Sequence, residues 1–154
     1  MRASKAIYGI ILMFVLLAGL DHITDESSLG IAIKLILGAL SITFAEIYSE
    51  IIGERIAKKS KLSSLEKRAI YNDAFAIISV SIIPCLVFLL ATTTFIETEL
   101  AFTVSYIYFL SMLFMFNYYA AITSSVPRFK SFLYALVTLM IGCLVILIKY
   151  IFGH

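Results

Sequence analysis

The sequence predicts an all-α, polytopic integral membrane protein with five transmembrane helices. Of its 154 residues, 62% are hydrophobic and only 14% are charged, and the mean hydropathy is +1.03. A soluble domain is typically about half apolar and roughly a quarter charged, so this chain has too few polar residues to cover a surface in water. The charged residues divide the chain into five apolar blocks, and most bases fall on one predicted side. This composition excludes a secreted disulfide scaffold, a disordered chain and a nucleic-acid-binding domain.

The first helix is expected at about 5–22. Its 15 uncharged residues, 6–20, are fewer than the roughly 20 that cross a bilayer core about 30 Å thick. Lys5 can extend this span because a flanking lysine reaches the interface with its charged end. Arg2 and Lys5 also resemble the basic start of a signal peptide. A retained helix is favoured, because residues 18–21 make a poor cleavage site.

The second helix is expected at about 29–53 and carries an acid inside it. Only 11 uncharged residues separate Lys34 from Glu46, so a spanning helix has to include Glu46. With a rise of 1.5 Å per residue, Glu46 lies about 10 Å from the cytoplasmic end. An acid at that depth costs on the order of 1 to 3 kcal/mol unless it is protonated, paired or hydrated. We therefore expect Glu46 to face a partner or a water-filled cavity.

The remaining helices are expected at about 71–96, 100–122 and 130–152, over apolar runs of 23, 28 and 18 residues. The polar stretch 54–68 precedes the third helix, and Ser63 or Ser64 followed by Glu66 is typical of a helix N-cap. We interpret this stretch as a solvated connector that also touches anionic lipid, in preference to a regulatory site. No linker or repeat interrupts the chain, which indicates a single transmembrane domain, 1–154.

The basic residues predict the orientation, because Lys and Arg favour the cytoplasmic side. Ten of the twelve share one predicted side: Arg2, Lys5, Arg55, Lys58, Lys59, Lys61, Lys67, Arg68, Arg128 and Lys130. Only Lys34 and Lys149 lie on the other side, next to the acidic loops 21–26 and 97–99. The N terminus is therefore expected in the cytoplasm and the C terminus outside, in a prokaryotic inner or plasma membrane.

Four polar side chains are expected at similar depth in the inner half of the membrane: Glu46, Glu50, Asp73 and Asn117. The spacing of Glu46, Glu50 and Glu54 stacks them on one face of the second helix. Carboxylate and amide oxygens suit Mg²⁺, Mn²⁺ or Fe²⁺. The four residues are therefore candidate metal ligands, and Glu54 is a secondary candidate that can instead pair with a base at the headgroup level. Asp73 can equally complement the dipole of the third helix.

Small residues predict a homodimer, because they let helices approach closely in lipid. They gather in the first and second helices: Gly9, Gly19, Gly38, Ala39 and Ala45. We expect a tight contact there, across a two-fold axis.

The sequence does not indicate an enzyme. It has no Ser/His/Asp arrangement, P-loop, HExxH motif or glycine-rich phosphate cradle, and Cys85 and Cys143 stand alone. No catalytic residue and no permanently bound cofactor are therefore expected. The thioether of Met13 is a soft metal ligand, but methionine in apolar helices usually packs against other apolar side chains.

Several segments resemble the vacuolar iron transporter family. The second helix contains Gly38-Ala39-Leu40-Ser41, then Glu46 and Ser49, which is similar to the family pattern GALSMALGEYVS. The first helix contains Gly9-Ile10-Ile11, then Phe14 and Leu16-Leu17-Ala18-Gly19, which resembles DGLVSTFALVAG. The proline in the third helix and the segment 131–153 are similar to the family's third and fifth helices, so the resemblance covers nearly the whole chain.

The resemblance implies a dimeric five-helix carrier that moves Fe²⁺ or Mn²⁺ out of the cytosol against protons, with Glu46 as the pathway glutamate. Tyr8 stands where the family has an aspartate in its first helix, and Ile42 where it has a methionine. The family's glutamate-rich cytosolic helices are absent, replaced by the short loop that ends at Arg68. Tyr8 is therefore a secondary site candidate, and Met13 is another because its thioether is a soft ligand.

Two functional hypotheses follow. The first is a small proton-coupled divalent cation exporter. In it, Glu46 is ligand and proton acceptor, Glu50 and Asp73 capture the ion, and Asn117 supplies an amide oxygen. The second is a non-transporting membrane protein of the same fold, such as an accessory subunit or an immunity-type protein, in which Glu46 is a buried contact that fixes dimer packing. The expected partners are the lipid bilayer, a second copy of the chain, the metal ion and protons, with no nucleic acid.

Overall fold

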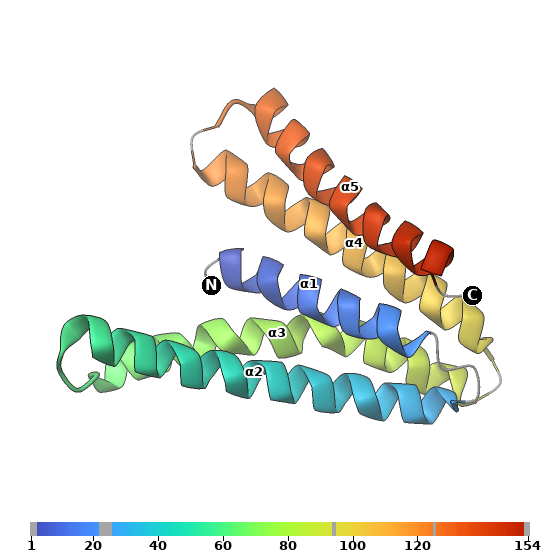
Figure 1. Cartoon of the computed structure of the whole chain (residues 1–154), viewed down its shortest axis with the longest axis horizontal. Coiled ribbons are helices and arrows are strands. Elements are labelled where there is room, and N and C mark those ends of the chain that lie inside the picture. The colour runs from blue at the N-terminus through green and yellow to red at the C-terminus, as the bar shows by residue number, and fades with distance from the viewer. Residues whose placement is uncertain (1–2, 22–25, 94, 125, 153–154) are drawn as a thin grey trace.

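The computed structural model describes residues 3–21, 26–93, 95–124 and 126–152. Five α-helices occupy nearly all of them, as Figure 1 shows: α1 (Ala3–Leu20), α2 (Ser28–Lys58), α3 (Ser64–Ala91), α4 (Thr98–Thr123) and α5 (Arg128–Phe152). The all-α class and the five predicted helices are thereby confirmed.

Two helices differ from the expected ranges by five residues or more, because those ranges followed the apolar runs alone, and the other bounds agree to within two residues. α2 continues past residue 53 to Lys58 and ends at Lys59, whose φ of 51° is left-handed. α3 begins at Ser64 rather than 71 and ends at Ala91 rather than 96. Its early start has a physical cause, since Ser63 and Glu66 form a complete capping box. The N-cap expected at Ser63 or Ser64 is therefore confirmed at Ser63.

α1 occupies the middle of the bundle. The α2–α3 pair lies on one side of it and the α4–α5 pair on the other, and α1 contacts all four helices (Figure 1). Its Ile10, Met13 and Leu17 are fully buried. A helix that is apolar on most of its faces packs inside a bundle, so the shortest helix of the chain forms its centre.

The helices alternate in direction along the chain. The start of α1 and the α2–α3 and α4–α5 connections lie at one end of the molecule (Figure 1). Nine of the ten bases assigned to one side belong to this end in the described part of the chain, and we call it the basic end. The opposite end, with the α1–α2 and α3–α4 connections, is called the far end. Alternation of the helices thus gathers the bases as the charge pattern predicts.

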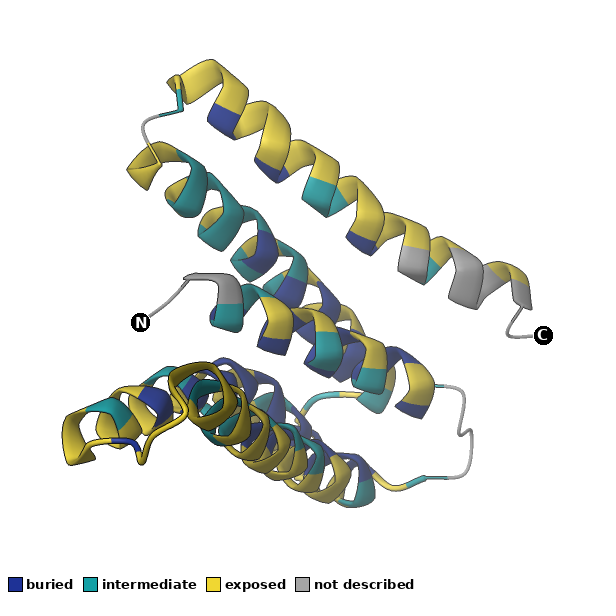
Figure 2. Cartoon of the chain, turned by 60° about the vertical axis from the view of Figure 1, so that its left-hand side comes forward, coloured by how far each residue is buried: buried dark blue, intermediate teal, exposed yellow. Residues whose placement is uncertain are grey.

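The outer surface of the bundle is apolar. Large side chains such as Leu37, Phe44, Phe75, Leu86 and Ile107 are exposed on it, and exposed positions follow the outer faces of the helices in Figure 2. Within the described residues, α2, α3 and α4 are long and apolar enough to cross a membrane. A surface of this kind fits lipid better than water, so the fold is that of a membrane-compatible helical bundle.

Two glycines expected at a dimer contact lie against helices of the same chain. A Cβ atom at Gly9 would lie 2.7 Å from Cγ1 of Ile77 in α3, and one at Gly38 would overlap the side chain of Leu16 in α1. Gly19 and Ala45 are exposed. The close approach that Gly9 and Gly38 permit is therefore within the bundle, and the homodimer stays a prediction.

Replacing Gly9 by valine is expected to destabilise the bundle by about 1 to 3 kcal/mol, because a fully buried Ile77 has no room to move away. The matched control is Gly19→Ala. Nothing lies within 4 Å of a Cβ at Gly19, and alanine favours the helix, so stability should hold or rise slightly. Thermal unfolding of the detergent-purified variants measures both effects. Equal unfolding temperatures would contradict the packing of α1 against α3.

Candidate functional site

Three glutamates follow one face of α2 toward the basic end. Glu46, Glu50 and Glu54 lie on successive turns of this uninterrupted helix, and all three are partly buried. Residues four apart in an α-helix are neighbours on its surface. The predicted acidic row is therefore present, and it leads from the apolar interior to the α2–α3 connection.

Lys5 of α1 completes the inner part of this row. Its ammonium group forms an ion pair with Glu50, and its Nζ lies 3.5 Å from Oε1 of Glu46. The Lys5 side chain is only 11% exposed, and those of Glu46 and Glu50 are 22% and 16% exposed. A cation is thus held between two carboxylates where α1 meets α2. We call these three residues the Lys5 cluster.

The pairing of Lys5 with Glu50 could have been predicted from the sequence. When one helix starts near residue 5 and its antiparallel neighbour ends near residue 53, Lys5 comes level with Glu50. Counting Lys5 only among the loop bases leaves this pairing out, because the count assigns charges to sides rather than to helix faces.

A cavity of about 100 Å³, with mostly charged residues in its lining, adjoins Glu50 between α2 and α3. It is lined by Glu50, Glu54, Lys58, Glu66, Ala69, Ile70 and Asp73. Four carboxylates surround a volume large enough for a few water molecules. Glu50 belongs both to this acidic cavity and to the Lys5 cluster, so it connects the two.

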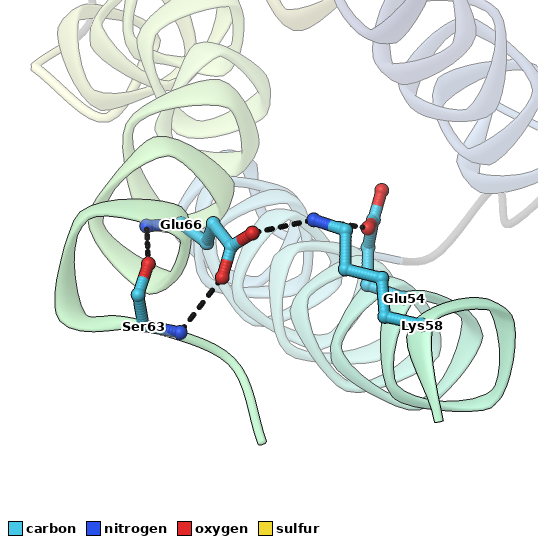
Figure 3. A network of polar contacts seen from close by, with 4 residues as sticks. All are labelled: Glu54, Lys58, Ser63 and Glu66. Atoms are coloured by element: carbon cyan, nitrogen blue, oxygen red, sulfur yellow. Dashed lines mark hydrogen bonds and ion pairs between the residues drawn. The ribbon is translucent and has the colours of Figure 1, made fainter. Parts of the chain in front are cut away.

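Lys58 bridges the two helices at the rim of the acidic cavity (Figure 3). Its Nζ donates to Oε1 of Glu66 at 2.5 Å and lies 3.1 Å from Oε2 of Glu54. Oε2 of Glu66 accepts the backbone N–H of Ser63 at 2.7 Å, and Oγ of Ser63 accepts the backbone N–H of Glu66 at 3.3 Å. These contacts join the end of α2 to the first turn of α3.

The same contacts shift two pKa values. The hydrogen bond from Lys58, followed by those with Ser63, lowers the pKa of Glu66 from 4.5 to about 2. Hydrogen bonds to Glu66 and then to Glu54 raise the pKa of Lys58 above 10.5. The contribution of Glu66 to stability is therefore complete above 4.5 and is lost as the pH falls toward 2, whereas that of Lys58 is lost only as the pH rises beyond 10.5.

We expect Glu66→Gln to lower the unfolding temperature at neutral pH and to lose most of this effect as the pH falls from 4.5 to about 2, because the wild-type carboxylate becomes protonated over that range. Thermal unfolding over a pH series measures the difference. In a Lys58→Gln background the difference should shrink, because Lys58 is the main cause of the shift. A difference that is independent of pH would contradict the bridge.

The other predicted site residues do not belong to the described lining of the acidic cavity. Asn117 of α4 donates from Nδ2 to the carbonyl oxygen of Leu113 in its own helix at 2.8 Å. Tyr8 is half exposed, and Met13 is fully buried in the apolar core. Within the described ranges, none of these three lines the acidic cavity. The structure therefore brings Glu50, Glu54 and Asp73 together, with Glu46 beside Lys5.

No complete metal-ligand set is assembled in this conformation. In the part of the chain that the structure describes, no three His, Cys, Asp or Glu side chains are placed to hold a metal ion together. The expected metal ligands are thus divided. Glu46 and Glu50 belong to the Lys5 cluster, Asp73 lines the acidic cavity, and Asn117 lies on α4. What remains is a carboxylate pair that binds one ammonium group, next to an acidic cavity.

Hydrogen bonds join the helices at the far end. The hydroxyl of Tyr106 in α4 donates to Oδ2 of Asp21 at 3.0 Å, and the hydroxyl oxygens of Ser28 and Thr98 lie 2.6 Å apart. Along α1 and α2, buried apolar side chains such as Met13 and Leu35 lie between these groups and the Lys5 cluster. An apolar core thus separates the cluster from the far end.

No protein-family model, curated protein or solved structure matches this chain. A fold of this kind does not define an activity. The function is therefore argued from the Lys5 cluster and the acidic cavity.

Proposed function

We propose that this chain is a small proton-coupled transporter of a divalent cation, Fe²⁺ or Mn²⁺, which leaves the cytosol through it. The observation that carries this proposal is the Lys5 cluster. A positive charge inside an apolar bundle is stable only when it is paired, and Glu46 and Glu50 provide that pairing for Lys5. The same two carboxylates can therefore hold another cation at this depth.

The charges of the cluster support exchange of a divalent cation against a proton. The two carboxylates and the ammonium group of Lys5 together carry one net negative charge, which a single proton neutralises. When Lys5 withdraws, the carboxylates carry two negative charges, which one divalent cation neutralises. Both loaded states are neutral, and neutral groups are the least costly to place inside a membrane. One proton is thus exchanged for each cation at the cluster.

The acidic cavity supports access from the basic end. Glu54 and Asp73 line it together with Glu50, which also contacts Lys5. A cation attracted by these carboxylates reaches the cluster through Glu50. Since bases favour the cytoplasmic side, we place the basic end in the cytosol. The five helices then span a prokaryotic inner or plasma membrane, with the N terminus inside and the C terminus outside.

The Lys5 contact also favours a second candidate function. A permanent ion pair between α1 and α2 would suit a non-transporting membrane protein, such as an accessory subunit, whose charges only fix the two helices. Because the contact lies within one chain, it would then stabilise the single bundle rather than a dimer. The two candidates differ in whether Lys5 leaves the carboxylates.

Flux of Mn²⁺ into proteoliposomes tests the proposal. We expect wild-type protein to carry Mn²⁺, faster with an opposing pH gradient, and Glu46→Gln to abolish the flux because one carboxylate cannot balance a divalent ion. Glu99→Gln is the control, since this acid lies in the first turn of α4, far from the cluster. Absence of flux with folded wild-type protein would favour the non-transporting candidate.

A further inference from the structure

A second hollow, of opposite charge, lies at the α2–α3 connection. Its volume is about 490 Å³, and its lining residues are Arg55, Lys59, Ser60, Lys61, Leu62 and Lys67. Four of the six are cations and none is an acid. We call it the basic hollow, and its size is within the range of small-ligand sites.

The charged side chains near the α2–α3 connection are divided between the acidic cavity and the basic hollow. Lys58 faces Glu54 and Glu66 at the acidic cavity (Figure 3). Within the described residues, no ion pair involves the four cations of the basic hollow, and all four side chains are exposed. Four like charges around one hollow repel one another unless an anion lies between them. The basic hollow therefore favours an anionic ligand.

The position of the basic hollow indicates where that anion comes from. It lies where α2 and α3, two helices of membrane-spanning length, leave their apolar segments. Ile56 and Leu65, each within two residues of a lining residue, are 71% and 77% exposed. Exposed apolar side chains next to bases are typical of segments that lie in the headgroup region of a bilayer.

We propose that the basic hollow binds the phosphate group of an anionic phospholipid from the adjacent leaflet. Arg55 offers a planar pair of N–H donors that matches phosphate oxygens, and the three lysines act as point charges. Pockets of bases at the cytoplasmic side of membrane helices suit such headgroups. This inference is independent of cation transport and needs only that α2 and α3 cross a membrane.

The test uses the full chain in nanodiscs of phosphatidylcholine that contain a small fraction of spin-labelled phosphatidylglycerol. The immobilised fraction of the label reports lipid bound to the protein. We expect Arg55→Gln/Lys61→Gln to weaken this binding about tenfold, because each base near anionic lipid contributes a several-fold factor. Arg128→Gln/Lys130→Gln is the matched control, with one arginine and one lysine removed at the same end but outside the basic hollow. It should leave binding nearly unchanged.

Two results would overturn the assignment. Equal weakening by both double variants would show that general surface charge, rather than the basic hollow, retains the lipid. Displacement of the labelled lipid by inorganic phosphate, beyond the effect of chloride at the same ionic strength, would assign the basic hollow to a soluble anion. If the double variant does not fold, the single variant Lys67→Gln repeats the comparison. Lys67 is exposed, and its replacement leaves both helix caps intact.

Discussion

Lys5→Gln should both weaken the bundle and open the carboxylate pair to external cations. Removing the ammonium group that lies between Glu46 and Glu50 leaves two partly buried carboxylates to repel each other, and we expect a loss of about 1 to 3 kcal/mol. Added Mn²⁺ should reverse this loss. A ligand at a hundred times its Kd stabilises the folded state by about 2.7 kcal/mol. Thermal unfolding in detergent, with and without Mn²⁺, measures both effects.

Two further variants separate charge from packing in this experiment. Lys5→Arg keeps a cation near both carboxylates and should stay close to wild type. The triple variant Lys5→Gln/Glu46→Gln/Glu50→Gln removes all three charges, so it should recover stability and lose its response to Mn²⁺. Equal stabilisation of the single and triple variants by Mn²⁺ would mean that the ion binds elsewhere.

Glu50→Gln should abolish the release of protons that Mn²⁺ causes in wild-type protein. We expect the wild-type cluster to release about one proton per bound cation, because in the proposed exchange a divalent ion replaces both the proton and Lys5. In the variant, only Glu46 remains opposite Lys5, and a single carboxylate cannot balance a divalent cation. A pH indicator in weakly buffered solution records the release after Mn²⁺ is added.

Glu54→Gln is the control for this measurement. Glu54 lies one turn from Glu50 on the same face of α2, but its side chain pairs with Lys58 at the rim of the acidic cavity. We expect this variant to slow the response while the number of protons per cation stays the same. Proton release from Glu50→Gln at the wild-type level would exclude Glu50 as a member of the exchanging pair.

The number and order of the helices could be predicted because charged residues interrupt the apolar sequence at each turn of the chain. The start of α3 could not be predicted from hydropathy, since its first turns hold Glu66, Lys67 and Arg68. There the signal was local, in the Ser63 capping box. Helix ends that depend on capping residues can be predicted from those residues, but not from the length of an apolar run.

The sequence predicted how deep in the membrane the candidate site residues lie, but only partly which neighbouring helices their side chains face. Glu46, Glu50 and Asn117 share a similar predicted depth, yet Asn117 belongs to α4, which packs against α1, α3 and α5. Helices that are apolar on most faces carry little information about which face meets which neighbour. For the same reason, Gly9 and Gly38 indicated a close helix contact without showing that the contact lies within the chain.

Calorimetric titration of the purified protein with Mn²⁺ tests the central claim most directly, because it asks whether Glu46 and Glu50 bind a divalent cation in competition with protons. We predict binding by the wild type at about pH 8, weaker binding at about pH 6, and none by Glu46→Gln. The absence of binding at both pH values, or binding that is unaltered in Glu46→Gln, would contradict the proposed site.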